Sequence, residues 1–400
     1  MGRAHGGDRA RAGGALSDLL VTTHTPILRS GQMMRTYGVA RALAAAGDGL
    51  TLLYVRFEGD APDAAFASIP GIELQAVTPS RGWRRALAYA GARAHGVPRH
   101  FARGISAELP KRAALLADAR ARGRVVADGP IAAAALGALA GRRPVIYNAH
   151  NLESAFRGEL QDGWRGVRGL RRFERGLIER AAESWMVSEA DIDQARQLAP
   201  AARLRYVPNV VDVAAIVPVQ TPPAAQRAIF VANFAYEPNR NGLAFLLESV
   251  LPLVWRELPE ARVSLVGPGS ENAPTQDARV ERAGFVPDLG AAYRGAHCAV
   301  VPLLQGGGSP LKFVEALAYG LPVVATTRAA AGLDVRDGRD CLLASDATSF
   351  AAALVRLLGA WDAEMSRAAR QLAAERYSIE ALTQILAGSQ PAASKSPGQN

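Results

Sequence analysis

The hydrophobic and polar positions of the chain alternate between short apolar runs and longer segments of helical periodicity. Apolar runs of strand length lie at 19–23, 50–55, 72–77, 125–127, 145–148, 184–187, 228–232, 262–266, 299–304 and 321–326. Helix-length segments such as 32–46 and 243–253 lie between several of these runs. Strands that alternate with helices predict parallel sheets covered by helices on both faces. We therefore expect an α/β protein built from two similar halves.

A segment with three prolines, at 213–227, separates these halves and reads as a linker. The pattern predicts a first domain over 17–208, a second over 209–375, and a terminal helix over 376–388. Residues 1–16 are rich in Gly, Ala and Arg, and 389–400 are rich in Ser and Pro, so both are expected to be disordered.

The composition describes a soluble globular protein, because 49% of its 400 residues are hydrophobic and 21% are charged. Two cysteines in apolar surroundings do not form a disulfide framework, which favours a reducing cytoplasm. The longest apolar stretch, 131–140, is half the length that spans a bilayer. No carboxylate cluster and no His/Cys spacing indicates a metal site, so none is expected.

The charge is uneven along the chain. Residues 1–205 carry 30 basic and 19 acidic side chains, and almost all of the excess is arginine. The segment 164–180 interleaves arginines with apolar residues, which is typical of a helix lying on an anionic membrane. A solvated helix is the alternative, and Glu174 and Glu179 favour it. No nucleic-acid-binding module is recognisable, so nucleic acid is not an expected partner.

The stretch 301–326 carries the clearest chemical signal. An apolar strand ends at three glycines, 306–308, followed by Ser309 and Pro310, the pair expected at the N-cap and first position of a helix. The amino end of a helix attracts anions, and glycines let a phosphate approach the backbone. Lys312 in the first turn adds a positive charge, and Glu315 on the same face suits a ribose hydroxyl pair. The alternative is an ordinary glycine-rich turn before an amphipathic helix.

The residues GGGSPLKFVEALAYGLPVVAT, at 306–326, resemble the donor-site signature of the retaining glycosyltransferases of family 4, or group 1. Glu315 occupies the second glutamate position, which binds the ribose in that family. The first glutamate position falls on Gly307, as in a variant subgroup with the motif GGGT-x-LK-x-LEA. The segment YVPNVVD, at 206–212, resembles the VPNGVD segment between the family's domains. The resemblance implies the GT-B fold: two Rossmann-like domains face each other across a cleft, and the C-terminal helix crosses back to the first domain.

A histidine lies where sheets of this class place ligands. His150 follows the strand at 145–148, just beyond its carboxyl end, where an imidazole could polarise or relay a proton. In similar transferases a histidine after this strand contacts the donor sugar. A histidine that only caps a loop is the alternative. Gly31 takes the place of a family glycine, and the resemblance implies that it approaches the donor phosphates or the acceptor, although a plain turn also explains it.

The family also grips the diphosphate with basic residues in the loop that begins the second domain. Here Asn233 occupies the first basic position, and Arg240 is the loop's only cation. Val286 lies in a segment whose backbone meets the nucleotide base in the family. The predicted catalytic residues are His150 and Lys312. The predicted nucleotide-binding residues are Gly31, Asn233, Arg240, Val286, Gly307, Gly308, Ser309, Pro310, Leu311, Lys312 and Glu315.

The expected activity is transfer of a hexosyl group from a UDP- or GDP-sugar to a hydroxyl of a saccharide or lipid-linked acceptor, with retention and without a cofactor or metal. Such an enzyme would be cytoplasmic, or held peripherally at the inner face of the membrane. Two alternatives stay open: a nucleotide-sugar epimerase of the same fold, and an inactive transferase-like partner protein.

Overall fold

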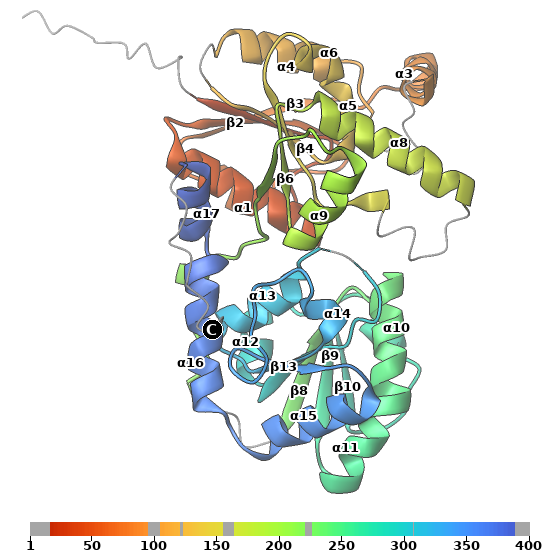
Figure 1. Ribbon diagram of the computed structural model, residues 1–400, viewed down its shortest axis with the longest axis vertical. Coiled ribbons are helices and arrows are strands. Elements are labelled where there is room, and N and C mark those ends of the chain that lie inside the picture. The colour runs from red at the N-terminus through yellow and green to blue at the C-terminus, as the bar shows by residue number, and fades with distance from the viewer. Residues whose placement is uncertain are drawn as a thin grey trace, which may run out of the picture.

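The computed structural model describes residues 17–94, 105–120, 123–154, 164–220, 226–306 and 308–388, which form two α/β lobes (Figure 1). Each lobe contains one parallel sheet with helices on both of its faces. The expected fold class is therefore confirmed. The segments expected to be disordered, 1–16 and 389–400, lie outside the described residues.

The first sheet has seven parallel strands in the order β3-β2-β1-β4-β5-β6-β7. The strands are β1 (Asp18–Thr22), β2 (Leu50–Val55), β3 (Ile72–Val77), β4 (Val125–Asp128), β5 (Val145–Asn148), β6 (Glu183–Met186) and β7 (Leu204–Tyr206). Strands β1, β2 and β4 are buried along their whole length, as expected for parallel strands covered on both faces.

The helices of the first lobe pack on both faces of this sheet (Figure 1). They are α1 (Gly31–Ala46), α2 (Ala64–Ala67), α3 (Gly82–Ala94), α4 (Leu109–Asp118), α5 (Pro130–Ala135), α6 (Gly137–Ala140), α8 (Trp164–Arg180) and α9 (Glu189–Leu198). Side-chain caps start two of them. The hydroxyl of Ser30 accepts a hydrogen bond from the Met33 amide, and that of Ser188 accepts one from the Asp191 amide.

The second sheet has six parallel strands in the order β10-β9-β8-β11-β12-β13. They are β8 (Arg227–Val231), β9 (Arg262–Val266), β10 (Val280–Gly284), β11 (Cys298–Val301), β12 (Val323–Thr326) and β13 (Leu342–Ala344). The strand order reverses between β1 and β4 in the first sheet and between β8 and β11 in the second. Ligands of open parallel sheets bind at the carboxyl ends of the strands beside such a reversal.

The second lobe is covered by α10 (Glu237–Phe245), α11 (Leu251–Glu257), α12 (Leu289–Arg294), α13 (Leu311–Ala318), α14 (Thr327–Ala330), α15 (Ala347–Gly359) and α16 (Ala363–Arg376). A π-helical turn, Leu246–Val250, joins α10 to α11, and short 3-10 turns lie at Val213–Ala215 and Ser270–Asn272. The sequence predicted a helix only from residue 243. Helix α10 begins six residues earlier, because Pro238 in its first turn fits a helix start.

The last helix returns to the first lobe. Helix α17 (Ile379–Leu386) packs beside α1 (Figure 1), and Leu382 is buried with Val39 and Leu43 of that helix. The guanidinium of Arg124, the residue before β4, donates a 2.7 Å hydrogen bond to the Leu386 carbonyl. The expected C-terminal crossover is confirmed.

Helix α8 corrects one expectation. Its apolar residues Leu170, Phe173, Leu177 and Ile178 are buried in the core of the first lobe, and Glu174 is only 1% exposed. The apolar face of this arginine-rich helix therefore packs against protein and is not available to a membrane. Glu174 is also not the solvated carboxylate that its place among arginines indicated.

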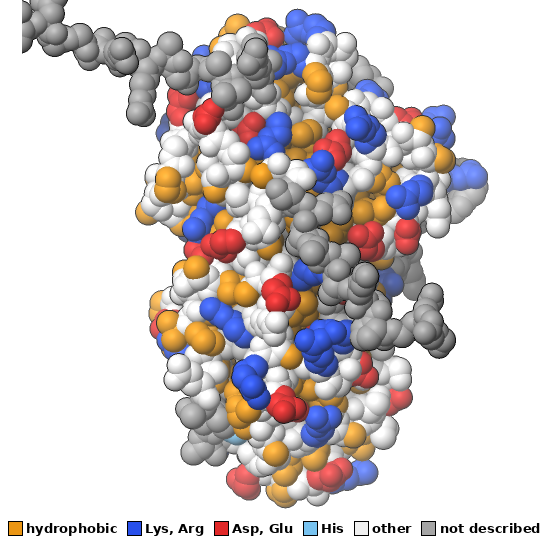
Figure 2. Space-filling view, turned by 60° about the vertical axis from the view of Figure 1, so that its left-hand side comes forward, with side chains coloured by type: hydrophobic (Ala, Val, Ile, Leu, Met, Phe, Trp, Pro, Cys, Tyr) orange, Lys and Arg blue, Asp and Glu red, His pale blue; other side chains and the backbone are white. Residues whose placement is uncertain are grey.

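Two further observations concern the distribution of charged side chains on the surface and the hydropathy of the helices. Basic and acidic side chains are intermingled over the face drawn in Figure 2. Among the described residues, we find no helix with both the length and the apolar character that crossing a bilayer requires.

Candidate functional site

The glycine loop between β11 and α13 lies against the first lobe. Gly308 has φ +74°, and a Cβ there would lie 2.8 Å from Oδ1 of Asn151 and 3.1 Å from Cγ2 of Val187. A Cβ on Gly332, behind the loop, would lie 2.1 Å from the Gly308 carbonyl oxygen. A Cβ on Gly308 would press on two side chains of the first lobe, and one on Gly332 would overlap the Gly308 backbone, so the two glycines let the loop lie against the first lobe. Gly307 lies outside the described residues, and its predicted role stays a prediction.

Helix α13 begins one residue later than the sequence predicted. Pro310 is the N-cap, and its side chain makes no capping bond. Ser309, expected to cap, precedes it, and its hydroxyl is buried without a hydrogen-bond partner among the described residues. Buried hydroxyls are nearly always paired, so this one points to a missing partner.

The amino ends of two helices from different lobes meet at this place. A Cβ on Gly31, the first residue of α1, would lie 3.6 Å from Cδ1 of Leu311, the first residue of α13. The first amides of each helix have no acceptor within their own helix, and each helix end carries partial positive charge. Three of the predicted residues, Gly31, Pro310 and Leu311, therefore lie around one electropositive point between the lobes.

Lys312 extends from the first turn of α13 toward the first turn of α10. Its Nζ donates a 2.5 Å hydrogen bond to Oδ1 of Asn239 and lies 5.1 Å from the ring centroid of Phe230. Burial lowers the pKa of the Lys312 ammonium to about 7, although Glu315 opposes the shift. An anion placed beside this amine would restore its full charge.

Glu315 lies one turn further along α13 and is held by a tyrosine. The hydroxyl of Tyr293 donates a 3.2 Å hydrogen bond to Oε2 of Glu315, and the Tyr293 ring stacks on Tyr319. Burial raises the pKa of Glu315 to about 7, although the Tyr293 hydrogen bond and Lys312 oppose the shift. The carboxylate keeps acceptor capacity for a hydroxyl pair.

The segment 233–242, which includes the start of α10, contains two predicted nucleotide-binding residues, Asn233 and Arg240. Arg240 is exposed, and its guanidinium donates a 2.7 Å hydrogen bond to the Ala235 carbonyl of the same segment. Asn233 is exposed, and its carbonyl accepts from the buried amide of Asn239 at 2.8 Å. The segment therefore reaches Lys312 through Asn239, which the sequence did not single out. Val286 is half-buried two residues after β10.

His150 is anchored by a carboxylate on the neighbouring strand. Its Nε2 lies 2.8 Å from Oδ1 of Asp128, and its side chain is 8% exposed. Thr36 and Asn148 also donate to Asp128, each at 2.7 Å. Burial would raise the pKa of Asp128, but His150 and these two hydrogen bonds lower it below its usual value. The ionised carboxylate takes the Nε2 hydrogen, so Nδ1 is the acceptor of a neutral His150 ring.

The residues that support His150 could have been found in the sequence. Asp128 and Asn148 are the last residues of adjacent buried strands, and polar side chains at that edge signal a site in parallel sheets. The next residue, Asn151, places His150 close to the glycine loop, since its Oδ1 would lie 2.8 Å from a Cβ added to Gly308. Tyr293 carries no comparable signal, because it reaches Glu315 from a helix 22 residues away.

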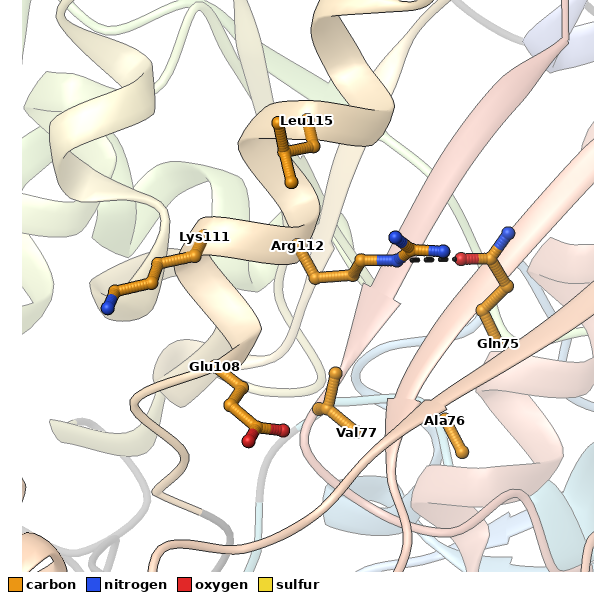
Figure 3. A pocket seen from close by; sticks show the side chains of 7 residues that line it. All are labelled: Gln75, Ala76, Val77, Glu108, Lys111, Arg112 and Leu115. Carbon is orange, nitrogen blue, oxygen red and sulfur yellow. Dashed lines mark hydrogen bonds between the residues drawn. The ribbon is translucent and has the colours of Figure 1, made fainter.

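A separate hollow lies at the outer edge of the first lobe, between β3 and α4 (Figure 3). Lys111, Arg112 and Leu115 of α4 line one side, and Arg112 donates a 3.1 Å hydrogen bond to Gln75 of β3. Three strands separate β3 from β5, which His150 follows, so this hollow is not part of the candidate site.

Comparison with known proteins identifies the class of protein to which this fold belongs. Residues 29–215 match the model described as Glycosyltransferase Family 4, and residues 225–360 match the one described as Glycosyl transferases group 1. Among solved structures, sucrose-phosphate synthase from Thermosynechococcus elongatus superposes with a TM-score of 0.71 at 17% identity, over 93% of this chain and 98% of that one. HepE from Anabaena in complex with UDP gives 0.67 at 14% identity, over 93% and 99%. These likenesses show the fold, which is GT-B.

The two family models lie side by side and together span most of the chain, so the protein belongs to the group 1, family 4 glycosyltransferases. A phosphatidyl-myo-inositol mannosyltransferase from Mycobacterium leprae is 33% identical over 132 residues, which is 31% of this chain and 35% of that protein. The chain thus matches about a third of the length of the first curated relatives.

Proposed function

We propose that the protein transfers a hexosyl group from a nucleotide-sugar donor to an acceptor hydroxyl. The observation that carries this proposal is the meeting of the amino ends of α1 and α13 beside Lys312, at the contact between the lobes. Two helix ends and a cation form a receptor for a diphosphate. Glu315, one helical turn from Lys312, is placed for the ribose that would follow it.

The chemistry follows from this placement. The bond between the anomeric carbon and the diphosphate oxygen breaks, a bond from the acceptor oxygen to that carbon forms, and the proton of the acceptor hydroxyl passes to the departing diphosphate. Negative charge develops on the departing diphosphate, where the α13 amides, the Ser309 hydroxyl and Lys312 stabilise it. Removing one well-placed donor of this kind costs about 3 kcal/mol of transition-state stabilisation. His150 Nδ1 accepts a hydrogen bond from a donor-sugar hydroxyl in this proposal, and we propose that the transfer retains the configuration at the anomeric carbon, as the resemblance of the donor-site sequence implies.

The donor is a UDP- or GDP-sugar in this proposal, and UDP-sugars are the first to test. The solved relative HepE binds UDP, and the Mycobacterium leprae relative is a mannosyltransferase. The test incubates the protein with a panel of UDP- and GDP-hexoses and follows nucleotide release with and without saccharide acceptors. Acceptor-dependent release supports transfer. An epimerised donor would instead identify an epimerase, and nucleotide binding without turnover of any donor would identify an inactive partner.

We further propose a saccharide or lipid-linked acceptor, in polysaccharide or glycolipid synthesis at the cytoplasmic face of a membrane. Helix α3 favours membrane contact, because Trp83 is 71% and Leu87 66% exposed beside the exposed Arg81 and Arg85. Phosphatidylcholine vesicles with and without phosphatidylglycerol test this contact. Membrane contact is supported if the protein sediments only with the anionic vesicles and if the Leu87→Ser variant sediments less. It is contradicted if the protein sediments with neither kind of vesicle.

A further inference from the structure

A buried chain of hydrogen bonds runs from His150 to the glycine loop of the other lobe. We propose that Arg35 and Asn209 are positioning residues that hold the Ser309 carbonyl, and with it the donor-binding loop, in register with His150. The inference rests on the proposed function, because it says which residues position the two parts of that same site relative to each other.

Arg35 is the centre of the chain. It lies on α1, is 2% exposed, and its Nη2 donates a 2.6 Å hydrogen bond to Oδ1 of Asn148. Its Nη1 donates to the Val207 carbonyl at 2.9 Å and to Oδ1 of Asn209 at 3.2 Å. One guanidinium therefore joins the end of β5 to the connector between the lobes.

Asn209 continues the chain across the lobe boundary. It is 8% exposed, and its Nδ2 donates a 2.7 Å hydrogen bond to the Ser309 carbonyl. A guanidinium can only donate, so it fixes the Asn209 oxygen toward Arg35 and the amide nitrogen toward Ser309. Arg35 of the first lobe therefore sets the orientation of the Asn209 side-chain amide, and this amide in turn donates to Ser309 of the second lobe.

The other end of the chain reaches His150. Nδ2 of Asn148 donates to Oδ1 of Asp128, and the same oxygen receives Nε2 of His150. Every link from His150 through Asp128, Asn148, Arg35 and Asn209 to Ser309 pairs a donor with an acceptor. The position of the second lobe is thereby linked to the orientation of the imidazole.

Stability alone does not account for this arrangement. Burial lowers the pKa of the Arg35 guanidinium to about 10, although Asp128 and Asp191 oppose the shift, and its Nε has no partner among the described residues. Well-packed apolar residues often replace buried charges without loss of stability. The directional hydrogen bonds of Arg35, which reach the second lobe through Asn209, explain why a charged side chain is buried at the lobe boundary.

The test compares Asn209→Ala with Arg41→Ala. Arg41 also joins α1 to the connector, through an ion pair with Asp212, and it makes no hydrogen bond to Gly306, Gly308 or Ser309, the described residues of the glycine loop. We expect Asn209→Ala to lower kcat for transfer about 10-fold or more, with the Kd for UDP changed less than about threefold. Arg41→Ala keeps kcat within about twofold, the range expected for a half-exposed ion pair. The double variant Arg35→Met, Asn209→Ala should lose no more activity than the worse single variant.

A second measurement needs no turnover. Spin labels on exposed residues of α2 and α11 report the separation of the lobes in the protein without substrate. We expect one narrow distance distribution for the unsubstituted protein and for Arg41→Ala, and a broadened one for Asn209→Ala. Unchanged kcat per folded molecule, or an unbroadened distribution, would overturn the inference. Absence of transfer by the unsubstituted protein would instead refute the proposed function, and the distances would still decide the role of Asn209.

Discussion

Nζ of Lys312 and Oδ1 of Asn239 lie 2.5 Å apart, and this hydrogen bond joins α13, the helix after the glycine loop, to the first turn of α10. The amide of Asn239 is held in turn by the Asn233 carbonyl. In the free protein the amine therefore has a neutral partner, and burial keeps its pKa near 7. Such an amine is ready to gain a proton when an anion arrives.

The first prediction concerns donor affinity. Lys312→Met keeps the aliphatic stem and removes the cation, so we expect the Kd for UDP to rise about 10- to 100-fold, as for loss of a charge-assisted hydrogen bond. Because the amine is a poorly solvated group in the free protein, the free energy of unfolding at neutral pH should not fall. Calorimetry and urea unfolding measure the two quantities. Unchanged affinity would remove Lys312 from the site.

The second prediction concerns the pH dependence of stability. The pKa of Glu315 is raised to about 7, so between its unfolded value and about 7 the folded state binds more protons than the unfolded state. The contribution of Glu315 to stability is therefore present at low pH and lost as the pH rises through about 7. The glutamine variant Glu315→Gln lacks this dependence. We expect its unfolding free energy to increase relative to the unsubstituted protein between about pH 5 and pH 7.5. Urea unfolding at both values tests this, and a constant difference contradicts it.

The third prediction concerns contact between the lobes. Gly308 and Gly338 both have φ +74°, but a Cβ meets Asn151 and Val187 only at Gly308, and nothing within 4 Å at Gly338. Gly338→Ala is therefore the matched control for backbone strain, which costs about 1–2 kcal/mol. We expect Gly308→Ala to cost similar stability but to lower transfer at least about 10-fold, because the loop must move from the first lobe. Equal activity of the two variants would show that the contact is dispensable.

The fourth prediction concerns the support of His150. Asp128→Asn keeps the size of the side chain but replaces the ionised acceptor of the Nε2 hydrogen. We expect kcat to fall about 10- to 100-fold with little change in the Kd for UDP, since the loss affects orientation and not nucleotide contacts. Nitrogen NMR of the imidazole reports the tautomer, which should change in this variant. A variant with the original tautomer and full kcat would exclude a role for the pair.

Buried strands could be predicted closely from the sequence, as could the edge strand β3 (72–77), whereas the edge strands β7 and β10 could not. The apolar run 50–55 is β2, because a parallel strand covered on both faces must be apolar throughout. Strand β10 (Val280–Gly284) lies at the edge of its sheet with exposed Glu281 and Arg282, and β7 (Leu204–Tyr206) is three half-buried residues. Neither carries a hydrophobic period that a reader of the sequence could detect.

The candidate site divides in the same way. Lys312 and Glu315 follow from the local pattern of a glycine loop and helix start. Asn239 does not, because it meets Lys312 across 73 residues of sequence, and only the fold brings the two together. Amphipathic segments share this limit. The arginine-rich helix α8 has a pattern that suits a membrane, yet its apolar face is buried against the sheet.

The central claim is that a nucleoside diphosphate is received between the amino ends of α13 and α1, beside Lys312. A crystal structure of the protein with UDP tests it most directly. We predict the pyrophosphate within hydrogen-bond distance of Lys312 Nζ, the Ser309 hydroxyl and the first amides of α13, with the ribose on Glu315. A pyrophosphate bound elsewhere, with Lys312 still on Asn239 and the Ser309 hydroxyl still unpaired, would contradict the account.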